Sequence, residues 1–281
     1  MQYIANLMTL AGIPPGIFQT LNGTKPTVDA LIEHPDVKAV SFVGTSFVAK
    51  LVADKARGLN KRALCLGGAK NHLCVLPDAD FDMCTSDIMN SFAGSTGQRC
   101  MAASVLVMVG FNEAHKKQFM DLLTKKAAAL KAGQEFGEVG PVIDDLSKNK
   151  ILKYINEAEA RDGAEVLVDG RTWATEKPQG FWVGPTILLH KSSGDAACKE
   201  EIFGPVLSVI QVEKSEEAIA IENSSPYGNA ACIYTSIGKH SEWFLSRFSS
   251  AMLGVNIGVP VGLGWRDSLQ EGRWGKSGEV G

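Results

Sequence analysis

Cysteine is scarce in this sequence. Only six cysteines occur among 281 residues, and no two of them form a CxxC pair. A disulfide scaffold needs a denser cysteine pattern, and a zinc ribbon needs paired short spacings. The sequence therefore predicts neither a disulfide-stapled domain nor a metal site, and its thiols are expected to be reduced.

An excess of charge and long apolar runs are lacking as well. The 28 Lys and Arg nearly balance the 31 Asp and Glu, which argues against a nucleic-acid partner. No run of 18 apolar residues occurs, so we expect no membrane partner. The first residues carry neither the basic region of a secretory signal nor the arginines of a transit peptide. We therefore expect an intracellular protein, in the cytoplasm or the mitochondrial matrix.

Strand-like and helix-like segments alternate along most of the chain. Thr45, Asp80 and Asn112 are expected to cap helices, and Gly133 to end one. The expected strands span residues 39–43, 72–76, 105–109, 165–168, 206–212 and 231–235. The expected helices span residues 46–57, 80–92, 112–132, 147–161, 215–223 and 240–248. This alternation predicts an α/β fold with a mainly parallel sheet.

Cys100 is the strongest candidate for chemistry. The small residues of segment 93–97 precede it and let a substrate approach the thiol closely. Arg99 is adjacent and is placed to hold the thiolate, which is the nucleophilic form. The competing interpretation is that Cys100 is a buried small hydrophobe, as free cysteines usually are and as we expect for the other five.

Two segments suit a nucleotide. A strand ending at Gly44, with Thr45 at the start of a helix, favours a phosphate on backbone N–H groups. Segment 200–206 places two carboxylates before an aromatic residue and a Gly-Pro turn, and a carboxylate can accept hydrogen bonds from a ribose. The alternatives are an ordinary strand–helix turn and a solvated acidic turn. Gly67 and Gly68 form a tight bend before His72, which we expect to be a buried core histidine rather than a base.

Taken together and in this order, these segments resemble the aldehyde dehydrogenase superfamily, from about Leu7 to Gly258. The matching blocks include the AGIPPG turn at 11–16, the FVGTS loop at 42–46, the GQRC block at 97–100 and the EEIFGPV block at 200–206. Two later landmarks match at 226–228 and 254–256. Several blocks at matching spacing are more specific than any one alone.

Within that superfamily the chain most resembles the CoA-acylating methylmalonate-semialdehyde dehydrogenase branch. The segments GAKNH at 68–72, GQRCMA at 97–102 and SPYGN at 225–229 carry this resemblance. Most hydrolytic members have Glu at the position of Leu66, where it activates the deacylating water. The CoA-dependent branch also lacks that Glu, and none is needed if a CoA thiolate attacks the acyl-enzyme.

The resemblance implies an NAD-dependent oxidation through Cys100. Its thiolate attacks the aldehyde, hydride passes to NAD+, and coenzyme A takes the acyl group from the resulting thioester. Arg99 is assigned to the substrate carboxylate, with a structural ion pair as the alternative. The implied cofactor-binding residues are Gly44, Thr45, Gly68, Glu201 and Phe203, with Thr45 at a phosphate, Glu201 at the nicotinamide ribose and Phe203 at the nicotinamide.

The implied organisation is a partial Rossmann-like NAD-binding domain at 1–65, a catalytic thiol domain at 66–261 and a truncated tail at 262–281. Only one strand–helix unit is expected before Leu64. The family's first half, with a second oxyanion donor, and the terminal strand of its homo-oligomers find no matching segment. Two alternatives stay open: a hydrolytic NAD(P) aldehyde dehydrogenase of the succinate-semialdehyde type, and a catalytically inactive fragment.

Overall fold

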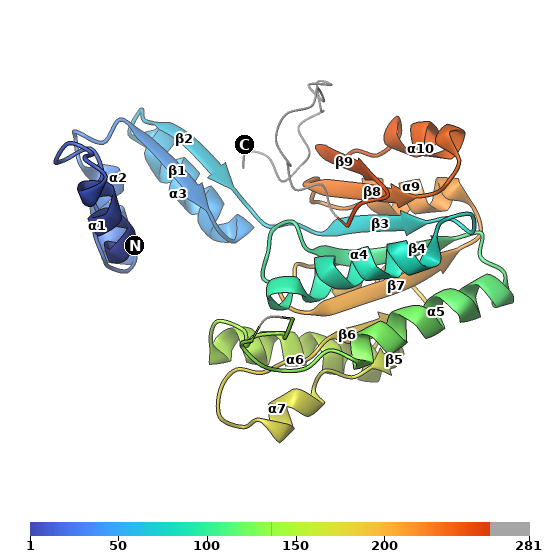
Figure 1. The fold of residues 1–281 in the computed structure, drawn as a ribbon. Helices are drawn as coiled ribbons and strands as arrows, with labels where there is room; N and C mark the ends of the chain where they lie inside the picture. Colours follow the sequence, from blue (N-terminus) through green and yellow to red (C-terminus); the bar gives the residue numbers. More distant parts are fainter. Residues whose placement is uncertain (136, 259–281) are drawn as a thin grey trace. The chain divides into compact units, whose positions relative to one another are not determined.

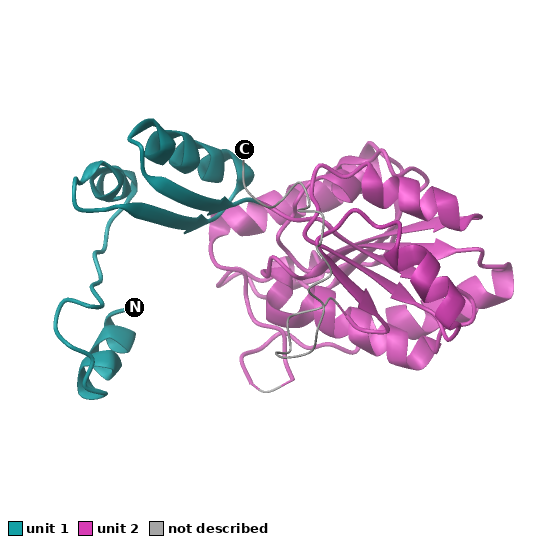
Figure 2. Ribbon diagram, turned by 90° about the horizontal axis from the view of Figure 1, so that it is seen from above, with its two compact units in different colours: residues 1–67, 279–281 teal, residues 68–278 magenta. Residues whose placement is uncertain are grey.

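The computed structural model describes residues 1–135 and 137–258, which fall into two units (Figure 2). The first unit comprises Met1–Gly67, and the second begins at Gly68. The predicted tail at 262–281 lies outside the described residues. Among the described helices, none has the length and apolar character needed to cross a membrane.

The first unit contains a parallel β–α–β arrangement preceded by two helices. Strands β1 and β2 pair in register from Ala39 opposite Arg62 to Val43 opposite Leu66. One strand–helix unit, β1 with α3, precedes Leu64 as expected, and the short segment 62–66 adds a second strand that was not predicted. The elements are α1 (Gln2–Leu10), α2 (Lys25–Glu33), β1 (Ala39–Val43), α3 (Ser46–Gly58) and β2 (Arg62–Leu66).

The second unit is built on a seven-stranded sheet in the order β5-β6-β7-β4-β3-β8-β9 (Figure 1). Strand β5 pairs antiparallel with β6, and all other neighbours are parallel, so the mainly parallel sheet is confirmed. The strands are β3 (Asn71–Val75), β4 (Ala103–Val109), β5 (Glu165–Val168), β6 (Thr186–Leu189), β7 (Val206–Val212), β8 (Ala230–Tyr234) and β9 (Met252–Val255).

Helices cover both faces of this sheet. One face packs its alternate residues, among them Leu73 and Leu106, against α4 and α5. The opposite face, including Cys74 and Val107, packs against α9 and α10, with α6 and α8 covering β6 and β7. The helices are α4 (Phe81–Ala93), α5 (Glu113–Ala128), α6 (Asp145–Ala160), α7 (Thr172–Glu176), α8 (Ala196–Lys199), α9 (Ser215–Asn223) and α10 (Gly238–Leu245).

Several element boundaries differ from the predicted ones. Helix α5 ends at Ala128, where the Leu130 N–H turns back to the Ala127 carbonyl, and it does not reach Gly133. Helix α6 begins at Asp145, because Asp144 accepts a hydrogen bond from the Ser147 N–H and caps it. The short strands β6 and β9 were not predicted from the sequence.

Candidate active site

Cys100 differs from every other cysteine in its environment. It is exposed, whereas the other five are buried. Burial raises the pKa of those five thiols, to about 12 for Cys198 and Cys232. A thiol that is buried without a cation stays protonated and unreactive, so Cys100 is the cysteine best suited to act as a nucleophile. The interpretation of Cys100 as a buried hydrophobe was wrong.

The loop before Cys100 has an unusual backbone. Ser95 and Thr96 have φ of 51° and 56°, and Gly97 has φ of 67°, so three consecutive residues are left-handed. Such a run is costly for residues that carry a Cβ, and it turns the chain sharply out of α4. A Cβ on Gly97 would also lie 2.1 Å from the Gly204 carbonyl oxygen. Position 97 therefore requires glycine.

Side chains of the loop fix it to its surroundings. Thr96 Oγ1 donates to the Gly140 carbonyl at 2.7 Å, and Gln98 Oε1 accepts from the Ile143 N–H at 2.9 Å. Arg99 Nη2 donates to the carbonyls of Asn90 and Ser91, at 2.6 and 2.8 Å, at the C-terminal end of α4. The two Arg99 bonds satisfy carbonyls that the end of α4 leaves without helical partners.

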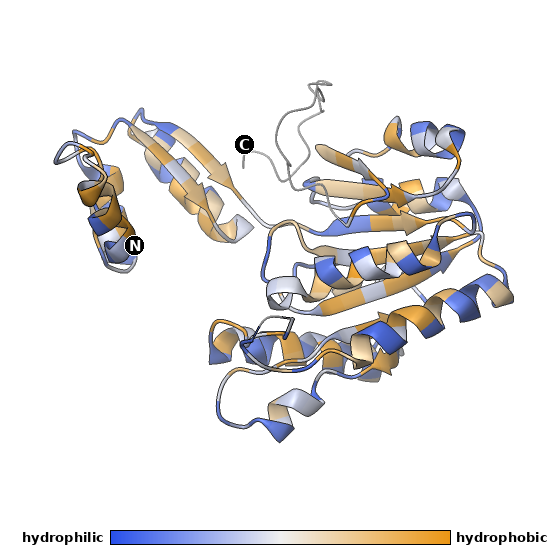
Figure 3. Ribbon diagram, in the orientation of Figure 1, coloured by the Kyte–Doolittle hydropathy of each residue, from blue (hydrophilic) through white to orange (hydrophobic). Residues whose placement is uncertain are grey.

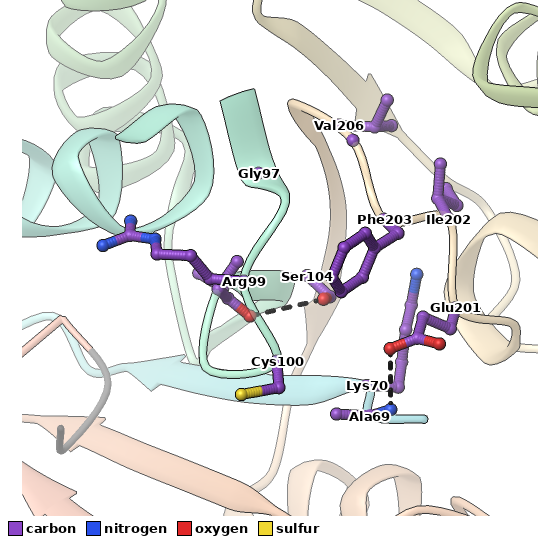
Figure 4. Close-up of a pocket in the computed structure, with 13 residues that line it drawn as sticks. Ala69, Lys70, Gly97, Arg99, Cys100, Ser104, Glu201, Ile202, Phe203 and Val206 are labelled. Atoms are coloured by element: carbon purple, nitrogen blue, oxygen red, sulfur yellow. Dashed lines mark hydrogen bonds between the residues drawn. The ribbon is translucent and has the colours of Figure 1, made fainter. Parts of the chain in front are cut away.

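Arg99 extends away from Cys100 in Figure 4, with its guanidinium on the end of α4. The guanidinium donates to two backbone carbonyls, so the geometry favours a structural role for Arg99 over contact with substrate. The bonds do not form the predicted ion pair, because neither acceptor is a carboxylate. A contact with a substrate carboxylate stays a prediction.

The loop after α8 faces the thiol loop. Phe203 has φ of 62°, so it is another left-handed residue with a side chain, and the residue is 43% exposed. Lys150 Nζ donates to the Glu201 carbonyl at 2.9 Å, and Tyr154 donates its hydroxyl to the carboxylate of Glu200. The backbone of this loop is thereby held, while the Phe203 ring stays open to a ligand.

The segment after the glycine bend holds the Glu201 carboxylate. The Ala69 N–H donates to Glu201 Oε1 at 2.9 Å. A Cβ on Gly68 would lie 2.6 Å from Glu201 Oε2, so a larger residue here would displace the carboxylate from its present position. Gly68 and Glu201, predicted separately from the sequence, are therefore direct neighbours.

Two buried ionisable groups lie next in the chain. Lys70 is 4% exposed, and burial lowers its pKa to about 8, against the attraction of Cys198 and Glu201. Burial and the charge of Lys70 lower the pKa of His72 to about 4, so this imidazole is neutral near pH 7. The expectation of a buried core histidine at 72 is confirmed.

One pocket joins these parts (Figure 4). Cys100 and Arg99 line it from the thiol loop, and Glu201 and Phe203 from the facing loop. Lys70 reaches it from the segment before β3. The exposed thiol, a carboxylate and an aromatic ring thus share one small opening, which is the arrangement that thiol chemistry beside a bound cofactor needs.

Gly44 and Thr45 belong to the first unit. Thr45 Oγ1 accepts from the Val48 N–H at 3.4 Å and caps α3, as predicted. The Gly44 N–H donates to the Leu66 carbonyl at 3.1 Å, and a Cβ on Gly44 would lie 2.7 Å from the Phe42 ring. The N-terminus of the 13-residue helix α3 presents N–H groups of the kind that bind phosphate.

Sequence reasoning missed three residues of the pocket region. Lys70 is the buried cation beside Glu201, and Asn71 and Asn229 both donate to the Cys100 carbonyl. All three lie within the GAKNH and SPYGN segments, so the signal was present. Their roles depend on distances between segments far apart in the sequence, which the motif letters do not contain.

The model of the aldehyde dehydrogenase family matches residues 1–277. The chain therefore belongs to the aldehyde dehydrogenase family. Malonate-semialdehyde dehydrogenase 2 of Geobacillus kaustophilus (strain HTA426) is 41% identical over 275 residues, which are 95% of this chain and 56% of that protein. The predicted family is thus confirmed.

The comparison with solved structures supports the same family assignment. Methylmalonate-semialdehyde dehydrogenase (DddC) from Oceanimonas doudoroffii superposes with a TM-score of 0.87 at 39% identity, over 92% of this chain and 53% of that one. A putative methylmalonate-semialdehyde dehydrogenase from Sinorhizobium meliloti 1021, complexed with NAD, gives 0.87 at 38% identity over the same shares. The chain spans about half the length of these relatives.

Proposed function

We propose that this chain carries the thiol chemistry of an NAD-dependent, CoA-acylating aldehyde dehydrogenase acting on a small semialdehyde such as methylmalonate semialdehyde. The observation that carries the proposal is the exposed Cys100 thiol in the pocket lined by Glu201 and Phe203. The names of the relatives, which are malonate- and methylmalonate-semialdehyde dehydrogenases, support the substrate class.

In the first half-reaction the Cys100 thiolate adds to the aldehyde carbonyl and forms a thiohemiacetal oxyanion. We assign the Cys100 backbone N–H, on the resemblance to the family, as a donor to that oxyanion. When bound, NAD+ accepts the hydride that leaves the former aldehyde carbon. Loss of that hydride collapses the oxyanion to a carbonyl and leaves a thioester on Cys100.

The residues of the pocket fit a nicotinamide nucleotide. The Gly68 backbone lies against the Glu201 carboxylate in a space that a Cβ would fill, and Ala69 orients one carboxylate oxygen. We assign the Glu201 carboxylate to the nicotinamide ribose hydroxyls and the Phe203 ring to the nicotinamide. Gly44 and Thr45 are assigned to the cofactor phosphate, because helix N-termini favour anions.

In the second half-reaction the thiolate of coenzyme A attacks the thioester and releases Cys100. Leu66, which stands where hydrolytic members carry a water-activating Glu, supports this acceptor, because a thiolate nucleophile needs no general base of that kind. For a methylmalonate-type substrate, the acyl group loses CO2, and the carbon that carried it takes up a proton before the transfer.

The test is a product assay on the purified chain. With aldehyde, NAD+ and CoA, we expect absorbance at the NADH wavelength and an acyl-CoA detected by mass spectrometry. Cys100→Ala abolishes both, whereas Cys84→Ala, which removes a buried thiol in α4, leaves Cys100 chemistry intact. Free acid as the only product would favour the hydrolytic alternative. No turnover together with no NAD+ binding would favour the inactive fragment.

A further inference from the structure

The backbone carbonyl of Cys100 lies between two asparagine side chains. Asn71 Nδ2 donates to it at 2.9 Å, and Asn229 Nδ2 donates to it at 2.9 Å. A carbonyl oxygen has two lone pairs, so two amide donors saturate it. The nucleophile thus has its own peptide group held by two residues that lie 29 and 129 positions away.

The two asparagines come from different elements. Asn71 is the first residue of β3 and is 1% exposed, and its amide also donates to the Ala102 carbonyl at 2.7 Å. Asn229 immediately precedes β8, and its amide also contacts Met101 Sδ at 3.1 Å. Strands β3 and β8 are paired, so the two donors rest on neighbouring strands of the sheet.

The two asparagine bonds to the Cys100 carbonyl, together called the clamp, act on the chain after the thiol. Thr96, Gln98 and Arg99 hold the chain before the thiol, and the two asparagines hold the Cys100–Met101 peptide after it. Asn71 also lies two residues after Ala69, whose N–H holds Glu201. One short segment therefore fixes the thiol loop and the carboxylate of the facing loop.

We propose that Asn71 and Asn229 are positioning residues for Cys100. Together they fix the orientation of its peptide group and so the direction of its side chain in the pocket. Neither residue touches substrate. The inference rests on the proposed function for its catalytic consequence, while the clamp itself is a property of the folded chain.

A double-mutant cycle, with amide hydrogen exchange as the readout, tests the clamp without a measurement of enzyme activity. Asn71→Ala and Asn229→Ala each leave the Cys100 carbonyl one donor, so each is expected to speed exchange of segment 98–104 about fivefold. The double variant leaves that carbonyl without either donor. We expect it to speed exchange of segment 98–104 about 100-fold, well beyond the product of the two single effects. Asn223→Ala is the matched control, because its amide donates to the Arg247 carbonyl away from the pocket.

Two readouts separate positioning from a purely structural role. Per intact Cys100 site, the double variant is expected to lower kcat about 100-fold with KM within about twofold, because the groups that bind substrate are untouched. In Asn71→Asp the ionised carboxylate faces two carbonyl oxygens. Loop protection and kcat, each taken relative to the wild type at the same pH, therefore recover only as the pH falls and the carboxyl regains a proton to donate.

The proposal is overturned if the two single effects on exchange simply multiply in the double variant, or if Asn223→Ala matches the pocket variants. It is also overturned if the double variant lowers Tm and leaves kcat per site unchanged. A wild-type chain that forms no NADH counts against the proposed function alone, because the exchange cycle still decides the clamp.

Discussion

The two units of this chain bury their apolar residues to very different degrees. In the second unit, helices cover both faces of the seven-stranded sheet, and side chains such as Leu73 and Leu106 are fully buried. In the first unit one small cluster packs between α3 and one face of the β1–β2 pair. On the other face Val43 is 66% exposed and Leu64 is 44% exposed, which is unusual for a parallel pair. Much of the ribbon of β1 and β2 has the orange colour of hydrophobic residues (Figure 3).

The difference shows where the chain can hold a reactive group rigidly. Every residue that lines the Cys100 pocket belongs to the second unit, whose strands and helices fix both loops. The first unit contributes the helix terminus at Thr45, carried by a two-stranded sheet of a kind that is only marginally stable alone. We therefore expect variants in the second unit to have large effects and variants in the first unit to have small ones.

The largest effect is expected for Gly97→Ala. The added Cβ would lie 2.1 Å from the Gly204 carbonyl oxygen, and φ of 67° is strained for alanine. We expect a loss of about 4 kcal/mol in the free energy of unfolding of the second unit, measured with urea. Gly58→Ala in α3 is the control, because nothing lies within 4 Å of its Cβ position and helix propensity favours alanine. If the two variants lost equal amounts of unfolding free energy, the contrast between the two units would be wrong.

Removal of core volume should act on one unit at a time. Leu106→Ala, in the centre of the sheet, is expected to cost the second unit about 3 kcal/mol. Val52→Ala, in the single cluster of the first unit, should cost less because the side chain is smaller. Unfolding followed by hydrogen exchange of peptides from each unit checks this. If Leu106→Ala loosened both units alike, the units would not be separate in stability.

Lys70 makes the stability of the second unit depend on alkaline pH. Its folded pKa of about 8 lies below the ordinary value of 10.5, so the unfolded chain binds more protons between these values. Stability therefore rises with pH across that window and is lost as the pH falls toward 8. Relative to Lys70→Met, the wild type should gain about 2 kcal/mol between pH 8 and 9.5 in urea unfolding. Lys117→Met is the matched control, because it changes an exposed lysine, leaves Lys70 in place and should therefore keep the wild-type rise.

The smallest effect is expected for Thr45→Ala. This change removes the hydroxyl that accepts the Val48 N–H and leaves a helix start uncapped. We expect a loss of about 1 kcal/mol from the first unit, seen by circular dichroism, and a return of most of it in Thr45→Ser. If NAD+ affinity, measured by calorimetry, were the same in Thr45→Ala and the wild type, the Thr45 hydroxyl would have no part in phosphate binding.

Periodicity predicted most of the second unit. Strand 206–212 and helix 215–223 have the predicted limits, and the caps at Thr45, Asp80 and Asn112 are confirmed by their side-chain hydrogen bonds. Strands β2, β6 and β9 were missed although their four or five residues match the lengths of the predicted β1, β3, β5 and β8. They form because a neighbouring strand supplies hydrogen bonds, which no local pattern reveals.

The candidate site was predictable in its residue types and not in its geometry. Composition alone favoured a buried Cys100, and the exposure of its thiol follows from the left-handed turn at 95–97. The direction of the Arg99 side chain is set by the open carbonyls at the end of α4. The clamp on the Cys100 carbonyl joins three distant segments, so only the folded chain shows it.

The central claim is tested most directly by looking for the acyl group on Cys100. The chain is incubated with a semialdehyde and NAD+ without CoA and is then digested. Mass spectrometry measures the mass of every peptide that contains a cysteine. The account predicts the acyl mass on the Cys100 peptide only, stable in buffer and removed within the assay time when CoA is added. An acyl mass on another cysteine, none at all, or discharge by water at the same rate as by CoA would contradict it.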